Sequence, residues 1–367
     1  MTTADQTQAE PQKTTSESSA NEAPSVQCAR DLLAFLTERA PTLSSLLILT
    51  HDFPDPDALA TAFALQHLLQ QGFGVESKIA YGGVIGRVEN RAMVTALKIP
   101  ARRFKRTDLR PGRPVALVDT QPAFQNNAFP RNRRATIVID QHASDKPVSA
   151  DLAIVDTGCG ATCVIVAQAL RLKNIEIPTR VATALAYGIL SDTLDLYRAT
   201  RSDVVQTYLS VLHHSDMKVL ARIQNPDRSK SFFVTLGRCI REAMVFRHLV
   251  VAHLGNIANP DLVSQMAEFL LTYDKIKWSV CTGRYKGRLH VSLRTTVQDT
   301  NAGEILRDVF DSRKDAGGHK AIAGGSFIVG LNVPEEVWKE REETLHTRLK
   351  QRLRISKRTA VRKPFQR

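Results

Sequence analysis

The amino-acid sequence predicts an α/β protein with two domains. The N-terminal domain is expected to contain a doubly wound, mostly parallel sheet, and the smaller C-terminal domain an α+β fold with a mixed sheet. A chain of 367 residues exceeds the usual size of a single hydrophobic core. Strand-like runs alternate with helix-like runs over about the first 200 residues, which is typical of a parallel sheet. The pattern then changes to strands joined by a hairpin-like turn.

The elements of the N-terminal domain are expected along residues 28–222. An amphipathic helix at 29–39 precedes a strand at 45–50 and a largely buried helix at 57–72, which begins with an acid and ends at a glycine. Continuous apolar runs at 115–118 and 137–139 are typical of parallel strands that helices cover on both faces. The remaining expected elements are a strand at 75–80 and helices at 161–172, 179–190 and 204–212.

A linker is expected at residues 223–234, where Asn225-Pro226-Asp227 interrupts the periodic pattern. The C-terminal domain then covers residues 235–350. Its expected strands and helices are strands at 246–253, 278–284 and 288–294, the last two joined by a turn at 284–287, and helices at 263–271 and 302–310.

The sequence predicts a tail at each end of the chain. Residues 1–27 are rich in Thr, Ser, Gln and Glu, with neither a basic start nor an apolar segment, so we expect a disordered tail rather than a signal peptide. The net charge is +13, and residues 350–367 hold eight Lys or Arg and no acid. We expect residues 351–367 to form a solvated basic tail that can also attract phosphates.

The composition indicates a cytoplasmic protein that does not enter a membrane. Hydrophobic residues make up 43% of the chain, and no apolar run approaches the roughly 18 residues that span a bilayer. The five cysteines contain no C-x-x-C pair, which favours buried thiols in a reducing compartment. Cys159 and Cys163 have no partner pair, so a structural role is favoured over a shared metal.

Acids stand where the strand-like runs end. "THDFPDPDALA" places His51, Asp55 and Asp57 after the first strand, "VALVDTQ" places Asp119 after another, and "IVIDQH" ends in Asp140, Gln141 and His142. A further acid, Asp192, follows the apolar helix in "ATALAYGILSDT". In an open parallel sheet such strand ends face one crevice, where ligands bind.

Several carboxylates in one crevice repel one another unless cations neutralise them, so the pattern predicts a metal site. Oxygen-rich ligand sets favour Mn²⁺ or Mg²⁺ over zinc. Each acid taken alone would more often be a helix cap or a loop acid, and His51 alone a hydrogen-bonded loop residue. Their joint occurrence in one sheet domain favours the metal site.

The motifs "HDFPDPDA", "VALVDT", "IVIDQH" and "GILSDT" resemble motifs I to IV of the DHH phosphoesterase superfamily. The resemblance is to the branch with oligoribonucleases, phosphoadenosine phosphate phosphatases and cyclic-dinucleotide phosphodiesterases. "VSLRTTVQDTNAGEILRDVFDSRKDAGGHKAIAGGSF" resembles the DHH-associated C-terminal domain, with its Ser-Leu-Arg strand and Gly-Gly-His loop. The resemblance covers about residues 46–329, and it implies an active site in the cleft between the two domains.

The resemblance implies a centre of two Mn²⁺ or Mg²⁺ ions that performs two-metal phosphoester hydrolysis. His51, Asp55 and Asp119 would hold one ion. Asp57, Asp119 and Asp192 would hold the other, with Asp119 bridging as a catalytic residue. Where this chain has Gln141, the family has a histidine that ligates the second metal. Gln141 is therefore a weaker candidate ligand, since a neutral carbonyl oxygen binds most transition metals less well than imidazole.

The resemblance also implies the residues that hold the substrate. Asp140 and His142 belong to the third motif, and His142, a candidate catalytic residue, would face the substrate phosphate. In the second domain, the backbone of Gly317 and Gly318, together with His319, would approach a phosphate that Arg294 clamps. These glycines alone would more often mark a turn.

The leading hypothesis is a phosphoesterase acting on short nucleotides or short single-stranded RNA, with a homodimer left open. The candidate substrates are oligoribonucleotides, linear or cyclic dinucleotides, and adenosine 3′,5′-bisphosphate. One alternative is a pyrophosphate or polyphosphate hydrolase of the same superfamily. The other is a nucleotide-binding or regulatory protein in which Gln141 has weakened the second metal site. The persistence of Asp57, Asp119 and Asp192 favours an active enzyme.

Overall fold

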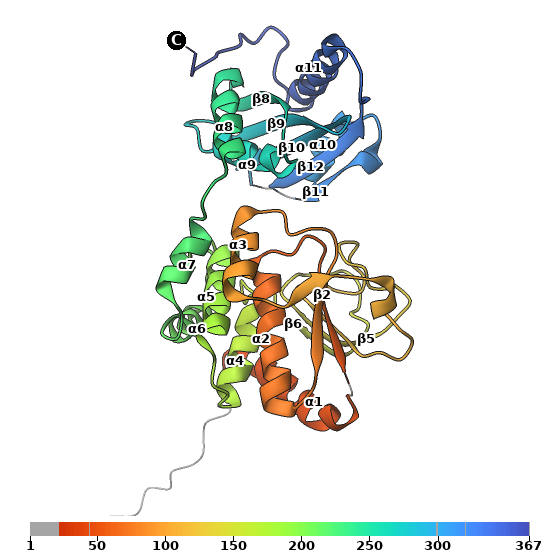
Figure 1. Cartoon of the computed structure of the whole chain (residues 1–367), viewed down its shortest axis with the longest axis vertical. Helices are drawn as coiled ribbons and strands as arrows, with labels where there is room; N and C mark the ends of the chain where they lie inside the picture. The colour runs from red at the N-terminus through yellow and green to blue at the C-terminus, as the bar shows by residue number, and fades with distance from the viewer. Residues whose placement is uncertain (1–21, 44, 299, 320, 367) are drawn as a thin grey trace, which may run out of the picture. The chain divides into compact units, whose positions relative to one another are not determined.

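The chain divides into two compact units, residues 1–226 and 227–367, which are described separately below (Figure 1). The structure is a computed structural model that describes residues 22–43, 45–298, 300–319 and 321–366. Within this part of the chain no helix is both long and apolar enough to cross a membrane.

Unit 1 contains a six-stranded sheet in the order β3-β2-β1-β4-β5-β6, and all its strand pairs are parallel. The expected parallel sheet is therefore confirmed. The order reverses between the adjacent strands β1 and β4, and open parallel sheets bind ligands at the carboxyl ends of the strands beside such a reversal. The strands are β1 (Leu46–Thr50), β2 (Ser77–Tyr81), β3 (Ala101–Arg103), β4 (Val115–Val118), β5 (Ala135–Asp140) and β6 (Ala150–Val155).

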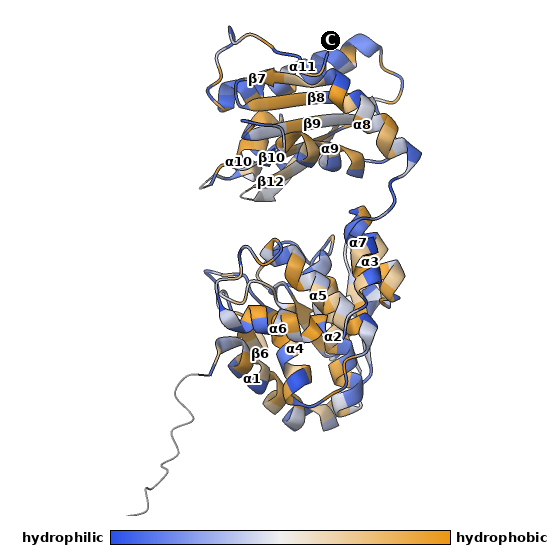
Figure 2. Ribbon diagram, turned by 90° about the vertical axis from the view of Figure 1, so that its left-hand side faces the viewer, coloured by the Kyte–Doolittle hydropathy of each residue, from blue (hydrophilic) through white to orange (hydrophobic). Residues whose placement is uncertain are grey.

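The helices of unit 1 share one hydrophobic core with one face of the sheet. Figure 1 shows most of them on one side of the strands, and in Figure 2 long stretches of their ribbon have the hydrophobic colour. They are α1 (Pro24–Arg39), α2 (Pro56–Phe73), α3 (Val88–Leu97), α4 (Cys163–Leu172), α5 (Thr179–Thr193), α6 (Ser202–Leu212) and α7 (Met217–Gln224).

Helices were expected on both faces of this sheet, but loops cover the other face. Loop side chains pack there, namely Phe104, Leu109, Phe129 and Val148. They lie in the connections between β3 and β4, between β4 and β5, and between β5 and β6. Because Pro122, Pro130 and Pro147 interrupt the last two connections, neither one forms a helix.

Helices extend further at two boundaries than expected. The helix α1 begins at Pro24, inside the tail expected at residues 1–27, because proline is favourable at the first helical position. The rest of that tail, up to residue 21, lies outside the described residues. The linker expected at 223–234 is shorter, since α7 ends at Gln224 and α8 (Lys230–Glu242) begins where the Ser229 hydroxyl caps it.

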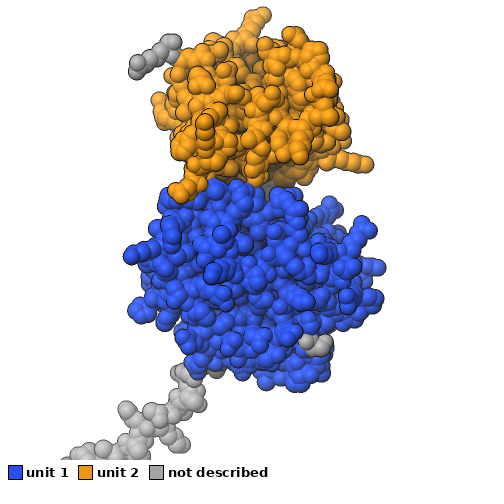
Figure 3. Space-filling model, viewed as in Figure 1, with its two compact units in different colours: residues 1–226 blue, residues 227–367 orange. Residues whose placement is uncertain are grey.

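Unit 2 (residues 227–367, Figure 3) contains a second six-stranded sheet, in the order β11-β12-β10-β9-β8-β7. Only β8 and β9 pair in parallel, so the expected mixed sheet is confirmed. The strands are β7 (Met244–Phe246), β8 (Leu249–Asn256), β9 (Trp278–Tyr285), β10 (Arg288–Thr295), β11 (Ala316–His319) and β12 (Ile322–Ile328).

The helices of unit 2 belong to two hydrophobic cores. Side chains of α10 (Ala302–Val309) and α11 (Glu335–Arg352) share one core with the sheet. Those of α8 and α9 (Asp261–Leu271) share the other. Three short 3-10 helices complete the described elements: η1 (Ala40–Thr42) and η2 (Arg106–Asp108) in unit 1, and η3 (Arg313–Asp315) in unit 2.

The basic C-terminal segment, expected as a solvated tail at 351–367, is mostly exposed but contacts unit 2 at a few residues. Val245 and Arg362 pair across an isolated antiparallel bridge, and the ring centroids of Tyr273 and Phe365 lie 5.0 Å apart. Ile355 is only 3% exposed. Apolar residues within the basic run thus anchor this segment on the unit as far as Gln366.

Candidate metal centre

A histidine and two acids meet where the strand order of unit 1 reverses. His51 follows β1, and Asp119 follows the adjacent strand β4. Asp55 precedes α2 and caps it, because its Oδ1 accepts a hydrogen bond from the backbone of Ala58 at 2.9 Å. Together His51, Asp55 and Asp119 bring one ligand atom each within 4.8 Å of one another.

The geometry of these three residues suits one cation. His51 Nε2 lies 3.7 Å from Asp55 Oδ2 and 3.5 Å from Asp119 Oδ2. Ligand atoms that each lie about 2.1 Å from a shared ion are separated by roughly 3 to 4 Å. His51 Nδ1 lies 2.8 Å from the Asp52 carbonyl oxygen, to which it donates a hydrogen bond, so Nε2 is the ring nitrogen that faces the two carboxylates. This is how a metal-ligating histidine is held.

The charges in the crevice call for a cation. Burial, and then the charges of Asp119, Asp192 and Asp55, raise the pKa of Asp57 well above its usual value. Burial, followed by the charges of Asp55 and Asp119, raises the pKa of Asp192 to about 8. Burial alone would lower the pKa of His51, but Asp119 and Asp55 outweigh it and raise that pKa well above its usual value.

The acids expected at a second ion accept hydrogen bonds from other groups. Asp57 lies in the first turn of α2, fully buried. Its carboxylate accepts from the backbone of Thr162 at 2.6 Å and of Cys163 at 2.9 Å. Gln141 Nε2 donates to Asp192 Oδ2 at 2.7 Å and to Asp57 Oδ2 at 3.3 Å. Asp192 lies in the last turn of α5 rather than just past the helix, because Asp192 and Thr193 continue the helical backbone.

Asp140, the last residue of β5, holds the His142 ring by a hydrogen bond. Asp140 is fully buried, and its Oδ1 accepts from His142 Nδ1 at 2.8 Å and from the Gln141 backbone at 2.9 Å. The hydrogen bond with Asp140 is the main cause that raises the pKa of His142 to about 9. Because Nδ1 is engaged, Nε2 is the ring nitrogen available to a substrate.

Sequence reasoning missed two residues of this site. Thr162 precedes α4, and its hydroxyl donates to Asp119 Oδ1 at 2.8 Å. Gln121 Nε2 donates to Asp140 Oδ2 and to the His142 carbonyl, both at 2.7 Å. The position of Thr162 before an apolar helix was a visible helix-start signal, but no sequence signal links Gln121 to Asp140.

The residues expected at the substrate in unit 2 lie on its sheet. Arg294 on β10 is 7% exposed, and its Nη1 donates to Ser292 Oγ at 2.7 Å. Gly317 and Gly318, expected in a loop, lie with His319 in β11, which pairs with β12. A Cβ atom on Gly318 would lie 2.3 Å from the Ile322 carbonyl oxygen, so close backbone approach within this hairpin requires glycine there. Binding of substrate by these four residues stays a prediction.

Comparisons with known proteins agree with the two-unit architecture. Residues 45–189 match the DHH family, N-terminal domain, and residues 247–351 match the DHHA1 domain. The chain thus contains a DHH-family N-terminal domain and a DHHA1 domain. It is 34% identical over 287 residues to an uncharacterized protein of Methanocaldococcus jannaschii. It is 27% identical over 160 residues to a probable manganese-dependent inorganic pyrophosphatase of Streptococcus pyogenes.

Neither alignment extends over the full length of the relative. The first covers 78% of this chain and 58% of its relative, and the second covers 43% and 51%. The chain therefore spans little more than half the length of either relative. Among solved structures, an exopolyphosphatase-related protein from Bacteroides fragilis shares the fold, with a TM-score of 0.62 at 15% identity. That likeness covers 89% of this chain and 98% of the other.

Proposed function

We propose that the protein is a Mn²⁺- or Mg²⁺-dependent phosphoesterase. The observation that carries this proposal is the arrangement of His51, whose Nε2 faces Asp55 and Asp119 at the strand-order reversal of a DHH-family sheet. One imidazole with two carboxylates is a donor set that suits a hard divalent cation. When bound, the cation supplies Lewis-acid polarisation of a phosphoryl oxygen.

The chain's own residues prepare the rest of the site. Asp140, itself held by Gln121 and by the Gln141 backbone, fixes the His142 ring through Nδ1. A protonated ring so held binds a phosphate oxygen through Nε2 and donates a proton to the leaving oxygen. Thr162 holds Asp119, so the carboxylate keeps one oxygen toward His51.

We propose short nucleotides or short single-stranded RNA as substrates, with Arg294, Gly317, Gly318 and His319 of the DHHA1 unit as substrate-binding residues. This substrate class follows from the family resemblance of the sequence motifs, with which the match of residues 247–351 to the DHHA1 domain agrees. A second candidate is pyrophosphate hydrolysis, because the Streptococcus pyogenes relative bears that activity in its name. A cytoplasmic location and a homodimer remain part of the proposal.

The test is a panel of metals and substrates applied to the purified full chain. Mn²⁺ and Mg²⁺ are combined with dinucleotides, adenosine 3′,5′-bisphosphate, cyclic dinucleotides and pyrophosphate, and released phosphate or nucleotide is measured. His51→Ala should lose metal-dependent hydrolysis. His67→Ala is the matched control, because His67 lies on α2 and its Nε2 contacts the Glu176 carbonyl oxygen at 2.9 Å, away from the acids.

The panel also separates the proposal from a regulatory protein that binds nucleotides without cleaving them. Metal-dependent turnover of a nucleotide by wild type and His67→Ala supports the proposal. Turnover of pyrophosphate alone would favour the second candidate. Nucleotide binding without turnover under any metal would contradict an esterase.

A further inference from the structure

Each acid that the family pattern assigns to a second cation already accepts a hydrogen bond from a neutral donor. Asp57 accepts from the backbone N–H groups of Thr162 and Cys163, at the amino end of α4. Asp119 Oδ1 accepts from the Thr162 hydroxyl. Asp192 Oδ2 accepts from the Gln141 amino group. The amino end of a helix favours an adjacent anion, so these donors offset part of the repulsion between Asp57 and the neighbouring acids.

The Gln141 side chain completes this arrangement. Its amino group carries two N–H donors on one nitrogen. That nitrogen lies 2.7 Å from Asp192 Oδ2 and 3.3 Å from Asp57 Oδ2, so it joins both carboxylates. Turning the carboxamide would place its carbonyl oxygen against two carboxylate oxygens, which repel it. An imidazole nitrogen at this position could donate at most one hydrogen, and only a shared cation would join it to both acids.

The positions of the ligand atoms in the described residues agree with hydrogen bonding by Gln141 in place of a second cation. Among the described residues, Asp57, Asp119 and Asp192 do not together form one of the sets whose ligand atoms all lie within 4.8 Å of one another. Asp119, Asp140 and His142 do form such a set, but His142 Nδ1 and Asp140 Oδ1 lie only 2.8 Å apart and are joined by a hydrogen bond. Two ligand atoms of one ion are usually separated by roughly 3 Å or more, so this pair is arranged as a hydrogen bond and not as two ligands.

We propose that the Gln141 carboxamide takes the place of the second cation, so that the centre binds one divalent ion, held by His51, Asp55 and Asp119. This inference rests on the proposed function for the identity of the ion. It makes Gln141 the residue that sets the number of metal ions, rather than a weak ligand of a second one. The family's two-ion centre is thereby reduced to one ion and a pair of hydrogen bonds.

The experiment counts Mn²⁺ ions on the full chain after a chelator has stripped it. Isothermal titration and elemental analysis of the dialysed protein should give one Mn²⁺ per wild-type chain and none at that affinity for His51→Ala. Gln141→His should gain a second ion. Electron paramagnetic resonance should then show an exchange-coupled pair in Gln141→His and an isolated Mn²⁺ in wild type.

Gln141→Glu is a second variant, because a carboxylate at 141 also needs a cation beside Asp57 and Asp192, and it should bind two ions. Two ions per wild-type chain would overturn the inference and leave the proposed function standing. A count that stays at one in both folded variants would also overturn it. One ion in wild type and two in a variant, without hydrolysis in the substrate panel, would support the inference while the proposed function fails. Absence of any Mn²⁺ binding would contradict both.

Discussion

A buried ion pair in unit 2 allows a sharp test of the structure. Arg284 on β9 is 8% exposed, and its Nε and Nη2 donate to the two oxygens of Glu342 at 2.9 and 2.8 Å. Its Nη1 donates to Glu335 Oε2 at 2.6 Å. Both acids lie on α11, but Glu342 is 4% exposed whereas the Glu335 side chain is 54% exposed. The two acids therefore bind the same arginine but differ in their exposure to solvent.

Glu342→Gln should cost roughly 3 to 5 kcal/mol of unfolding free energy, because it leaves the buried Arg284 charge without its main partner. Glu335→Gln should leave the free energy of unfolding nearly unchanged, since water screens that contact. At a slope of about 2 kcal/mol per molar urea, Glu342→Gln should lower the unfolding midpoint of unit 2 by about 2 M.

The assay is urea unfolding of the full chain, followed by fluorescence of Trp278 and Trp338, both of which lie in unit 2. The double change Arg284→Met with Glu342→Leu should recover most of the loss, because it removes both charges together. Equal midpoints for Glu342→Gln and Glu335→Gln would refute the reasoning, since burial would then make no difference to the pair.

Three further predictions concern pH, metal affinity and packing. Burial, then the charges of His346 and Arg284, lowers the pKa of His253 to about 3. The unfolded chain therefore binds the extra proton below about pH 6.5, and unfolding free energy should fall, by up to about 1.4 kcal/mol per pH unit, as pH drops from 6.5 toward 3. His253→Gln should flatten this dependence in urea titrations at pH 7, 6 and 5. Thr162→Val should weaken Mn²⁺ binding about tenfold or more by calorimetry, while Thr162→Ser retains it. Gly188→Ala should destabilise the folded protein by about 1 to 3 kcal/mol in thermal unfolding, because the new Cβ would lie 2.9 Å from Ala60 Cβ. The control is Gly237→Ala, whose new Cβ would contact only the tip of the Arg241 side chain. It should stabilise the protein by up to about 1 kcal/mol, since alanine favours a helix more than glycine does.

Patterns repeated along an element could be read from the sequence. The apolar runs at β1, β4 and β5 predicted a parallel sheet, and their terminal acids predicted which side chains gather at its edge. Elements without such patterns were missed. The edge strand β6 (Ala150–Val155) has exposed and buried residues mixed along it, and α11 is strongly charged. Tertiary packing, rather than local periodicity, decides these elements.

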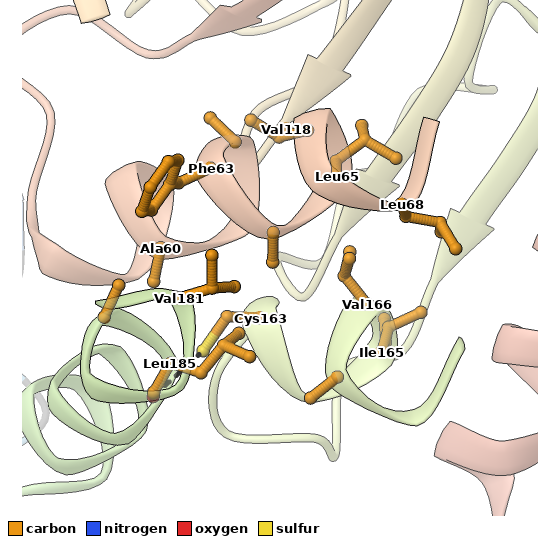
Figure 4. Packing of buried hydrophobic residues seen from close by; sticks show 14 of the residues in the cluster. Ala60, Phe63, Leu65, Leu68, Val118, Cys163, Ile165, Val166, Val181 and Leu185 are labelled. Atoms are coloured by element: carbon orange, nitrogen blue, oxygen red, sulfur yellow. Dashed lines mark hydrogen bonds between the residues drawn. The ribbon is translucent and has the colours of Figure 1, made fainter. Parts of the chain in front are cut away.

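The residues that bury the two faces of the unit 1 sheet show a second limit of prediction from the sequence. A continuous apolar strand reports that both faces are buried, but not what buries them. In unit 1, α2, α4 and α5 pack closely around Ala60, Cys163 and Leu185 on one face (Figure 4). Proline-rich connections bury the opposite face. The helical expectation failed there because the covering residues, such as Phe129, are isolated apolar residues within irregular segments.

The candidate site shows why residue type alone did not settle the role of Gln141. A carboxamide can present either its carbonyl oxygen to a cation or its amino group to an acid, and both readings fit the same letter in "DQH". What decides between them is how many donors the facing acids already accept. Those donors come from Thr162 and Cys163, which α4 brings to Asp57 from 105 and 106 positions away in the chain. Because α2 and α4 pack against each other in the same core, that core sets the separation between Asp57 and these donors. In the proposed one-ion centre, Gln141 therefore acts together with the core packing that places these donors beside Asp57.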